Sequence, residues 1–111
     1  MAGKNPILLV QGDQNVDIDV TLTDAATNAV IDVSASTVRL FYRAMGDDDL
    51  TATITCTKPG GGTDGKVRAT LTAACMAEAG VYEGEFEIET GSKKQTVYAK
   101  QKFKVREQLE V

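Results

Sequence analysis

Residues 80–106 constrain the fold most, because apolar and charged side chains alternate along two successive runs. In the first run, the apolar positions are Tyr82, Gly84, Phe86 and Ile88, and glutamates fill the intervening ones. In the second run, Val97, Ala99, Phe103 and Val105 share one face, opposite Lys100, Lys102, Lys104 and Arg106. A period of two is typical of a half-buried strand. Two such runs around a short polar stretch with glycine predict a β-hairpin.

Charge matching indicates a register for this hairpin. If residues 93–94 form the turn, Glu83 lies opposite Lys104. Two lysines suit such a turn poorly because it requires positive φ angles, so a loop led by Gly91 is the alternative. Either choice keeps the two faces, and each exposed charge pair contributes only roughly 0.2–1 kcal/mol.

The rest of the chain shows the same short alternating runs, separated by turn signals. We expect strands at residues 6–11, 15–23, 37–44, 50–57 and 66–72, a short extended piece at 30–33, and one or two helical turns at 73–79 before the hairpin. This order predicts an antiparallel β-sandwich of seven to eight strands, with one short helical turn before the penultimate strand. A partly open barrel is the alternative, and the strands at 6–11 and 50–57 are the candidate edges.

The length of 111 residues predicts a single domain. Residues 1–5 are expected to form a short polar arm, and residues 6–111 the domain itself. A net charge of −4 argues against a nucleic-acid partner. The longest apolar run near the N-terminus, residues 7–10, is too short for a signal peptide or a membrane span, so we expect no membrane partner. Cys56 and Cys75 are therefore expected to be free thiols, with Cys56 buried.

No constellation of residues predicts catalysis, a cofactor or a bound metal. Residues 60–66 imitate a phosphate loop, but a strand rather than a helix is expected to follow. Residues 13–19 have the alternating acids of a calcium loop without its sixth-position glycine, and residues 47–49 fit a solvated loop tip. The absence of histidine removes the commonest general base. We predict that the protein is not an enzyme.

Phe41 is the main candidate for a protein interface. It is expected to point outward between Arg39 and Arg43, and this combination of residue types is enriched at interface hot spots. The alternative is that a neighbouring loop or the N-terminal arm covers Phe41. Ile7 and Leu9 of the N-terminal edge strand are further interface candidates.

Residues 79–82 resemble the approach to the penultimate strand of immunoglobulin-like domains, where a tyrosine bonds back to the backbone in a tyrosine corner. The resemblance is to domains without the inter-sheet disulfide, because Gly84 stands at the cysteine position. An immunoglobulin-like sandwich is thereby implied. The residues expected to have structural roles in it are Gly80, Tyr82, Gly84, Phe86 and Phe103.

The chain also resembles the immunoglobulin-like N-terminal domain of phage baseplate upper proteins. The matching segments are Gly12-Asp13, Thr37-Val38-Arg39-Leu40, Gly65-Lys66-Val67, Leu71-Thr72, residues 80–86 and Phe103-Lys104-Val105. The resemblance implies a virion structural or decoration protein of a tailed phage, assembled in the host cytoplasm. Its partners would be other virion proteins on the capsid, neck, tail or baseplate. Association with further copies of the same chain is an open alternative.

The alternative function is a ligand-binding module, such as a carbohydrate-binding or host-adhesion domain on the same scaffold. Such modules need exposed aromatic rings to stack on sugars. Phe41 is the one ring that the sequence leads us to expect on the surface.

Overall fold

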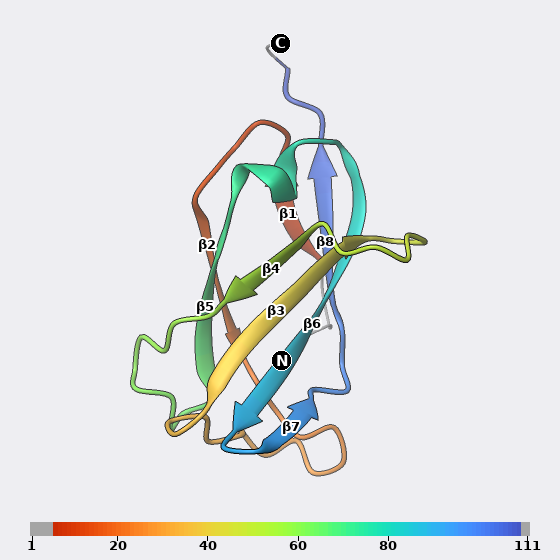
Figure 1. The fold of residues 1–111 in the computed structure, drawn as a ribbon. Coiled ribbons are helices and arrows are strands. Elements are labelled where there is room, and N and C mark those ends of the chain that lie inside the picture. Colours follow the sequence, from red (N-terminus) through yellow and green to blue (C-terminus); the bar gives the residue numbers. More distant parts are fainter. Residues whose placement is uncertain (1–5, 110–111) are drawn as a thin grey trace.

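The computed structural model describes residues 6–109, in which eight strands and one 3₁₀ turn occur (Figure 1). In chain order these are β1 (Ile7–Val10), β2 (Val16–Thr21), β3 (Thr37–Ala44), β4 (Ala52–Thr55), β5 (Lys66–Leu71), η1 (Ala73–Met76), β6 (Gly80–Thr90), β7 (Lys93–Thr96) and β8 (Gln101–Arg106). The number of strands lies within the predicted seven to eight, and a short helical turn precedes β6. The expected last strand is divided into β7 and β8, so β6 is the third strand from the end rather than the penultimate one. The expected arm at residues 1–5 lies outside the described part of the chain.

The strands form two sheets. The larger has the order β1-β8-β6-β3-β4, with β7 pairing the far end of β6, and the smaller consists of β2 and β5. β1 runs parallel to β8, whereas the other paired strands are antiparallel. The short extended piece expected at residues 30–33 does not form a strand, and Val30 makes an isolated bridge with Thr23.

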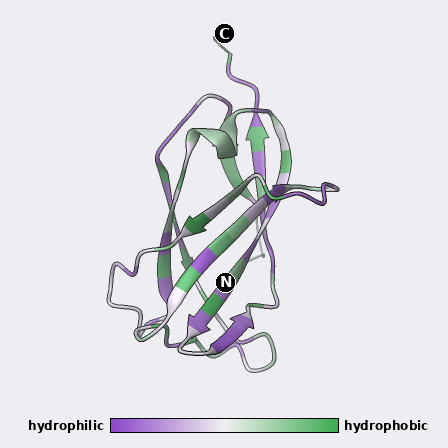
Figure 2. Cartoon of the chain, in the orientation of Figure 1, coloured by the Kyte–Doolittle hydropathy of each residue, from purple (hydrophilic) through white to green (hydrophobic). Residues whose placement is uncertain are grey.

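The hydrophobic core lies between the two sheets. Alternate side chains of β2 and β5 are buried in the same cluster as those of β3, β6 and β8. Hydrophobic and hydrophilic residues accordingly alternate along the strands in Figure 2. The largest fully buried side chains are Tyr42, Phe86 and Phe103. The inward positions predicted in residues 80–106 are therefore confirmed, except that Ala99 is only half-buried. Leu50, the first residue of the strand expected at 50–57, is exposed.

Three rings form an aromatic cluster, defined as Tyr42, Tyr82 and Phe103, at one end of this core. Tyr42 stacks on Tyr82 and meets Phe103 edge-on, with ring centroids 5.0 Å apart in both pairs. The Tyr42 hydroxyl donates to the Cys75 carbonyl at 2.9 Å, and the Tyr82 hydroxyl to the Glu78 carbonyl at 2.7 Å. Both phenols thus keep a hydrogen bond inside the protein, and burial raises the pKa of each.

Both cysteines are buried free thiols. Cys56 lies just beyond β4, and burial raises the pKa of its thiol to about 12. Cys75 lies in the η1 turn and is fully buried. The expectation that Cys56 packs in the core is confirmed.

The predicted hairpin is present, but in the register led by Gly91. Thr90 pairs with Lys93, which leaves Gly91 in the turn at a φ of 60°. Glu83 lies opposite Lys102 and not Lys104. The second run leaves the ladder between β7 and β8, where the buried Val97 donates its N–H to the Phe86 carbonyl.

Phe103 covers Gly84, although its direct partner across the strands is Tyr82. A Cβ atom on Gly84 would lie 2.9 Å from Phe103 Cε1 and 2.7 Å from Leu40 Cδ1. Glycine is therefore required here, because the Phe103 ring and the Leu40 side chain already fill the space.

Candidate functional site

The candidate site is the outer sheet face, which we define as the solvent-facing side of β1, β8, β6, β3 and β4. It carries the side chains of Arg39, Phe41 and Arg43, which alternate with the buried residues of β3. On the neighbouring β6 the glutamates predicted to point outward lie opposite these three residues. The structure thus brings the predicted interface residues onto one surface.

Phe41 lies at the centre of this face and is half-buried. It lines a shallow pocket of about 140 Å³, together with Arg43, Leu50, Glu83, Gly84, Glu85 and Lys100. Leu50 comes from the loop between β3 and β4, and 51% of its surface is exposed. The result lies between the two expectations, because Phe41 is neither fully covered nor fully exposed. It forms an apolar wall in a pocket rimmed by charges.

Glu83 forms ion pairs at the edge of this pocket, and Arg39 forms two more further along β3 and β6. Arg43 Nη2 lies 2.7 Å from Glu83 Oε2, and Lys100 Nζ lies 3.7 Å from Glu83 Oε1. Arg39 Nη1 lies 3.3 Å from Glu87 and 2.8 Å from Glu89. The glutamates were expected to pair mainly with lysines of the hairpin, and that expectation is wrong. β3 pairs with β6 on the edge opposite to the hairpin, where Arg39 lies opposite Glu87 and Arg43 lies opposite Glu83.

These ion pairs make the free energy of unfolding depend on pH. The hydrogen bond from Arg43 is the main cause that lowers the pKa of Glu83, and that from Arg39 lowers the pKa of Glu89. A carboxylate with a lower pKa in the folded than in the unfolded state stabilises the fold above its unfolded pKa. That contribution is lost as the pH falls through the lower, folded value.

We therefore expect the free energy of unfolding to fall below about pH 4.5, near the pKa of an unfolded glutamate. Arg43→Met should flatten this dependence, because Glu83 then loses its main partner. The control is Arg106→Met, since the guanidinium of Arg106 bonds a backbone carbonyl. Urea unfolding between pH 3 and 7 measures the effect, and equal pH slopes for wild type and Arg43→Met would contradict it.

Ile7 and Leu9 of β1 were both predicted as interface residues, and the prediction for Leu9 is wrong. Only 6% of Leu9 is exposed, and Ile7 is half-buried. Leu8 points outward instead, with 75% of its surface exposed. The cause is the parallel register, which places Leu9 beside the buried Val105 and Leu8 beside the exposed Lys104. β1 and β4 are the two ends of the larger sheet, as predicted.

The sequence did not identify an apolar row, which we define as Leu8, Val81 and Met45, across one end of the outer sheet face. Lys104 lies between Leu8 and Val81, and the Met45 N–H donates to the Val81 carbonyl. Val81 and Met45 are each 47% exposed. The alternation of β6 places Val81 outward, so that this member could have been predicted.

Tyr98 was also missed, and Phe41 is therefore not the one exposed ring. Tyr98 is 87% exposed. It lines a second, wider pocket of about 240 Å³ between the connection from β7 to β8 and the loop after β2. Its position between the inward residues Val97 and Ala99 would have predicted an outward ring.

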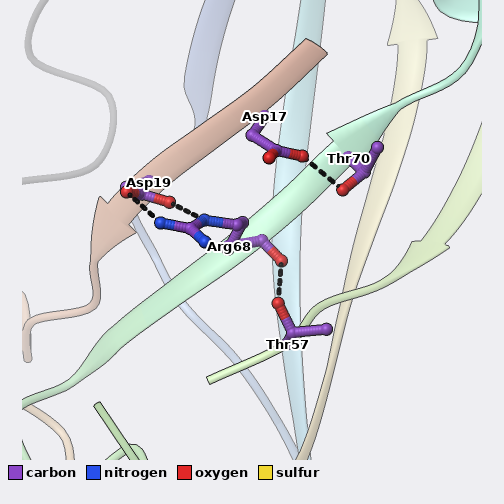
Figure 3. A network of polar contacts seen from close by, with 5 residues as sticks. All are labelled: Asp17, Asp19, Thr57, Arg68 and Thr70. Carbon is purple, nitrogen blue, oxygen red and sulfur yellow. Dashed lines mark hydrogen bonds and ion pairs between the residues drawn. The ribbon is translucent and has the colours of Figure 1, made fainter. Parts of the chain in front are cut away.

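The outer face of the smaller sheet carries a different polar network (Figure 3). Arg68 donates to both carboxylate oxygens of Asp19, at 2.8 and 3.1 Å, and Thr70 donates to Asp17 at 2.6 Å. The Thr57 hydroxyl bonds the Arg68 carbonyl at 3.5 Å. The acids that imitate a calcium loop are thus paired to the neighbouring strand. Within residues 6–109 no group of three potential metal ligands occurs.

Comparison of the sequence with protein-family models and with curated proteins gives no match in either case. Among the described residues, no helix is long and apolar enough to cross a membrane.

Proposed function

We propose that this chain is an immunoglobulin-like, non-enzymatic structural protein of a tailed phage. It docks onto a repeated surface of the capsid, neck, tail or baseplate. The outer sheet face is the docking surface, with Phe41 at its centre.

The topology supports the immunoglobulin-like assignment. In the proposed assignment, the neighbouring strands β3, β6 and β8 take the places of strands C, F and G of that fold, and the pair β2 and β5 takes the places of B and E. The hydrogen bond from Tyr82 to the carbonyl of Glu78 fits a tyrosine corner. The segment resemblance to baseplate upper proteins supports a place in a phage particle.

One observation carries the docking role: exposed apolar side chains and arginines share the outer sheet face. Leu50 and the apolar row present aliphatic surface, while Arg39 and Arg43 are held in fixed directions by glutamates. Aromatic residues, methionine and arginine are enriched at protein interfaces. Arginines held in place by ion pairs lose little side-chain entropy on binding.

The test is quantitative mass spectrometry of purified tailed-phage particles whose genome encodes the chain. We expect the chain at a fixed ratio to the major capsid or tail protein, because docking on a symmetric particle gives a defined copy number. Particles that contain every other virion protein but not this chain would contradict the proposal.

The second candidate function, carbohydrate binding, is favoured by Tyr98. Its exposed ring lies beside Thr23, Asp24, Gln95 and Thr96, whose side chains offer hydrogen-bonding groups at the same pocket. One oxygen of Asp24 accepts from the N–H groups of Ala26 and Thr27, which shapes the adjoining loop. A ring with polar neighbours fits one face of a neutral sugar.

A glycan array tests this candidate. Specific binding that disappears in Tyr98→Ala and persists in Phe41→Ala would assign a sugar site to the second pocket. An array without specific binding would remove the candidate.

A further inference from the structure

The outer edge of β1 has backbone groups directed away from the sheet. The Gln11 N–H donates to the Arg106 carbonyl at 2.8 Å, so Leu9 and Ile7 also direct their backbone groups to β8. Leu8 and Val10 alternate with them and direct theirs outward. The Val10 carbonyl accepts from the Asp13 N–H within a turn. A neighbouring strand could use the N–H and carbonyl of Leu8 and the N–H of Val10.

β1 is short, at four residues, but its edge lacks the other devices that usually protect an edge strand. Charged side chains, internal prolines and bulges normally prevent strand addition. β1 reads Ile-Leu-Leu-Val, without a charge, and pairs with β8 alone within residues 6–109. The exposed side chain of Leu8 offers apolar contact beside these backbone groups. An extended segment can therefore add to the sheet at β1.

The charges beside β1 decide which segment fits. Lys102, Lys104 and Arg106 are exposed on the outer face of β8, and none of the ion pairs within residues 6–109 includes them. A second copy of the chain paired through β1 would place two such positive rows on one continuous sheet, three strand spacings or about 14 Å apart, which is unfavourable at low salt. An acidic segment would instead meet a complementary row.

We infer that β1 is a strand-addition site for an extended segment of another protein, in which acidic and apolar residues alternate. The inference deepens the proposed function and rests on it, because it names the kind of partner that the particle would present. The acidic side chains lie toward Lys104 and Arg106, and the segment's backbone bonds to Leu8 and Val10.

The experiment titrates the whole chain with two short, capped synthetic peptides, one alternating valine with glutamate and the other alternating valine with lysine. We expect the glutamate peptide to bind about tenfold more tightly at low salt, and the difference to shrink at high salt. Amide hydrogen exchange should slow at Leu8 and Val10 in the complex. Lys104→Glu should reverse the preference between the peptides.

The matched variants are Leu8→Pro and Leu8→Ala. Proline removes the outward N–H and is tolerated on an edge, so it should weaken peptide binding about tenfold, whereas alanine keeps that donor and should weaken binding less. If Leu8→Pro does not fold, the exchange pattern of the wild type decides. Equal affinity for both peptides, no binding of either, protection at other strands, or a dimer of the chain alone would each overturn the inference.

The two proposals fail separately. A chain that is present in particles but does not bind the glutamate peptide contradicts the strand addition alone. A chain that binds the peptide at Leu8 but is absent from particles contradicts the phage assignment and leaves the strand addition supported.

Discussion

Replacing Phe103 with alanine is expected to lower the free energy of unfolding by about 3–5 kcal/mol. Phe103 is fully buried, meets Tyr42 edge-on and fills the space above Gly84. Alanine would leave a cavity between the sheets that backbone glycine cannot fill. A loss of this size is a large part of the stability of a typical domain.

Urea unfolding followed by tyrosine fluorescence measures this effect. Tyr98→Ala is the control, because Tyr98 is almost fully exposed and its removal should change stability by no more than about 0.5 kcal/mol. Similar midpoints for Phe103→Ala and Tyr98→Ala would contradict the prediction that the packing of Phe103 stabilises the core.

Gly65→Ala should destabilise the protein by about 2–4 kcal/mol. Gly65 has a φ of 73°, and a Cβ atom there would lie 2.9 Å from the Leu22 carbonyl oxygen and 3.1 Å from that of Ile31. The clash is with backbone atoms, which cannot rotate away as a side chain can. The same two segments are also joined by a hydrogen bond from the Leu22 N–H to the Gly65 carbonyl. The turn that starts β5 would have to move away from β2.

Gly61→Ala is the matched control for this prediction. Gly61 also has a positive φ, of 84°, but a Cβ atom there would have no neighbour within 4 Å. It should therefore cost only about 1 kcal/mol, for the backbone conformation itself. Equal losses in the two variants, measured by thermal unfolding, would mean that the contacts of Gly65 contribute nothing.

The alternation of residue types predicted most strands and their inward faces, because burial on one face of a strand requires a period of two. The hairpin register was not predictable in the same way. Outward charges recur at every second position, so Glu83 can face Lys104 or Lys102 equally well. The turn at Gly91 and the burial of Val97 decide between these registers.

The candidate site was predictable in part. Arg39, Phe41 and Arg43 lie on one outward face, as their spacing indicated. The ion-pair partners of Arg39 and Arg43 were not predictable. The hairpin places one strand beside β6, but which strand pairs with β6 on its opposite edge depends on the topology of the whole sheet. The apolar run of β1 contains no polar residue to mark its outward side, so Leu9 was chosen where Leu8 is exposed.

Docking through the outer sheet face is tested most directly by rebinding the purified chain to particles assembled without it. Co-sedimentation would compare wild type with Phe41→Ser and, as a matched aromatic control, Tyr98→Ser. We predict saturable binding that Phe41→Ser weakens about thirtyfold or more, the scale of a hot-spot residue, and that Tyr98→Ser leaves unchanged. No saturable binding, or a loss confined to Tyr98→Ser, would contradict the account.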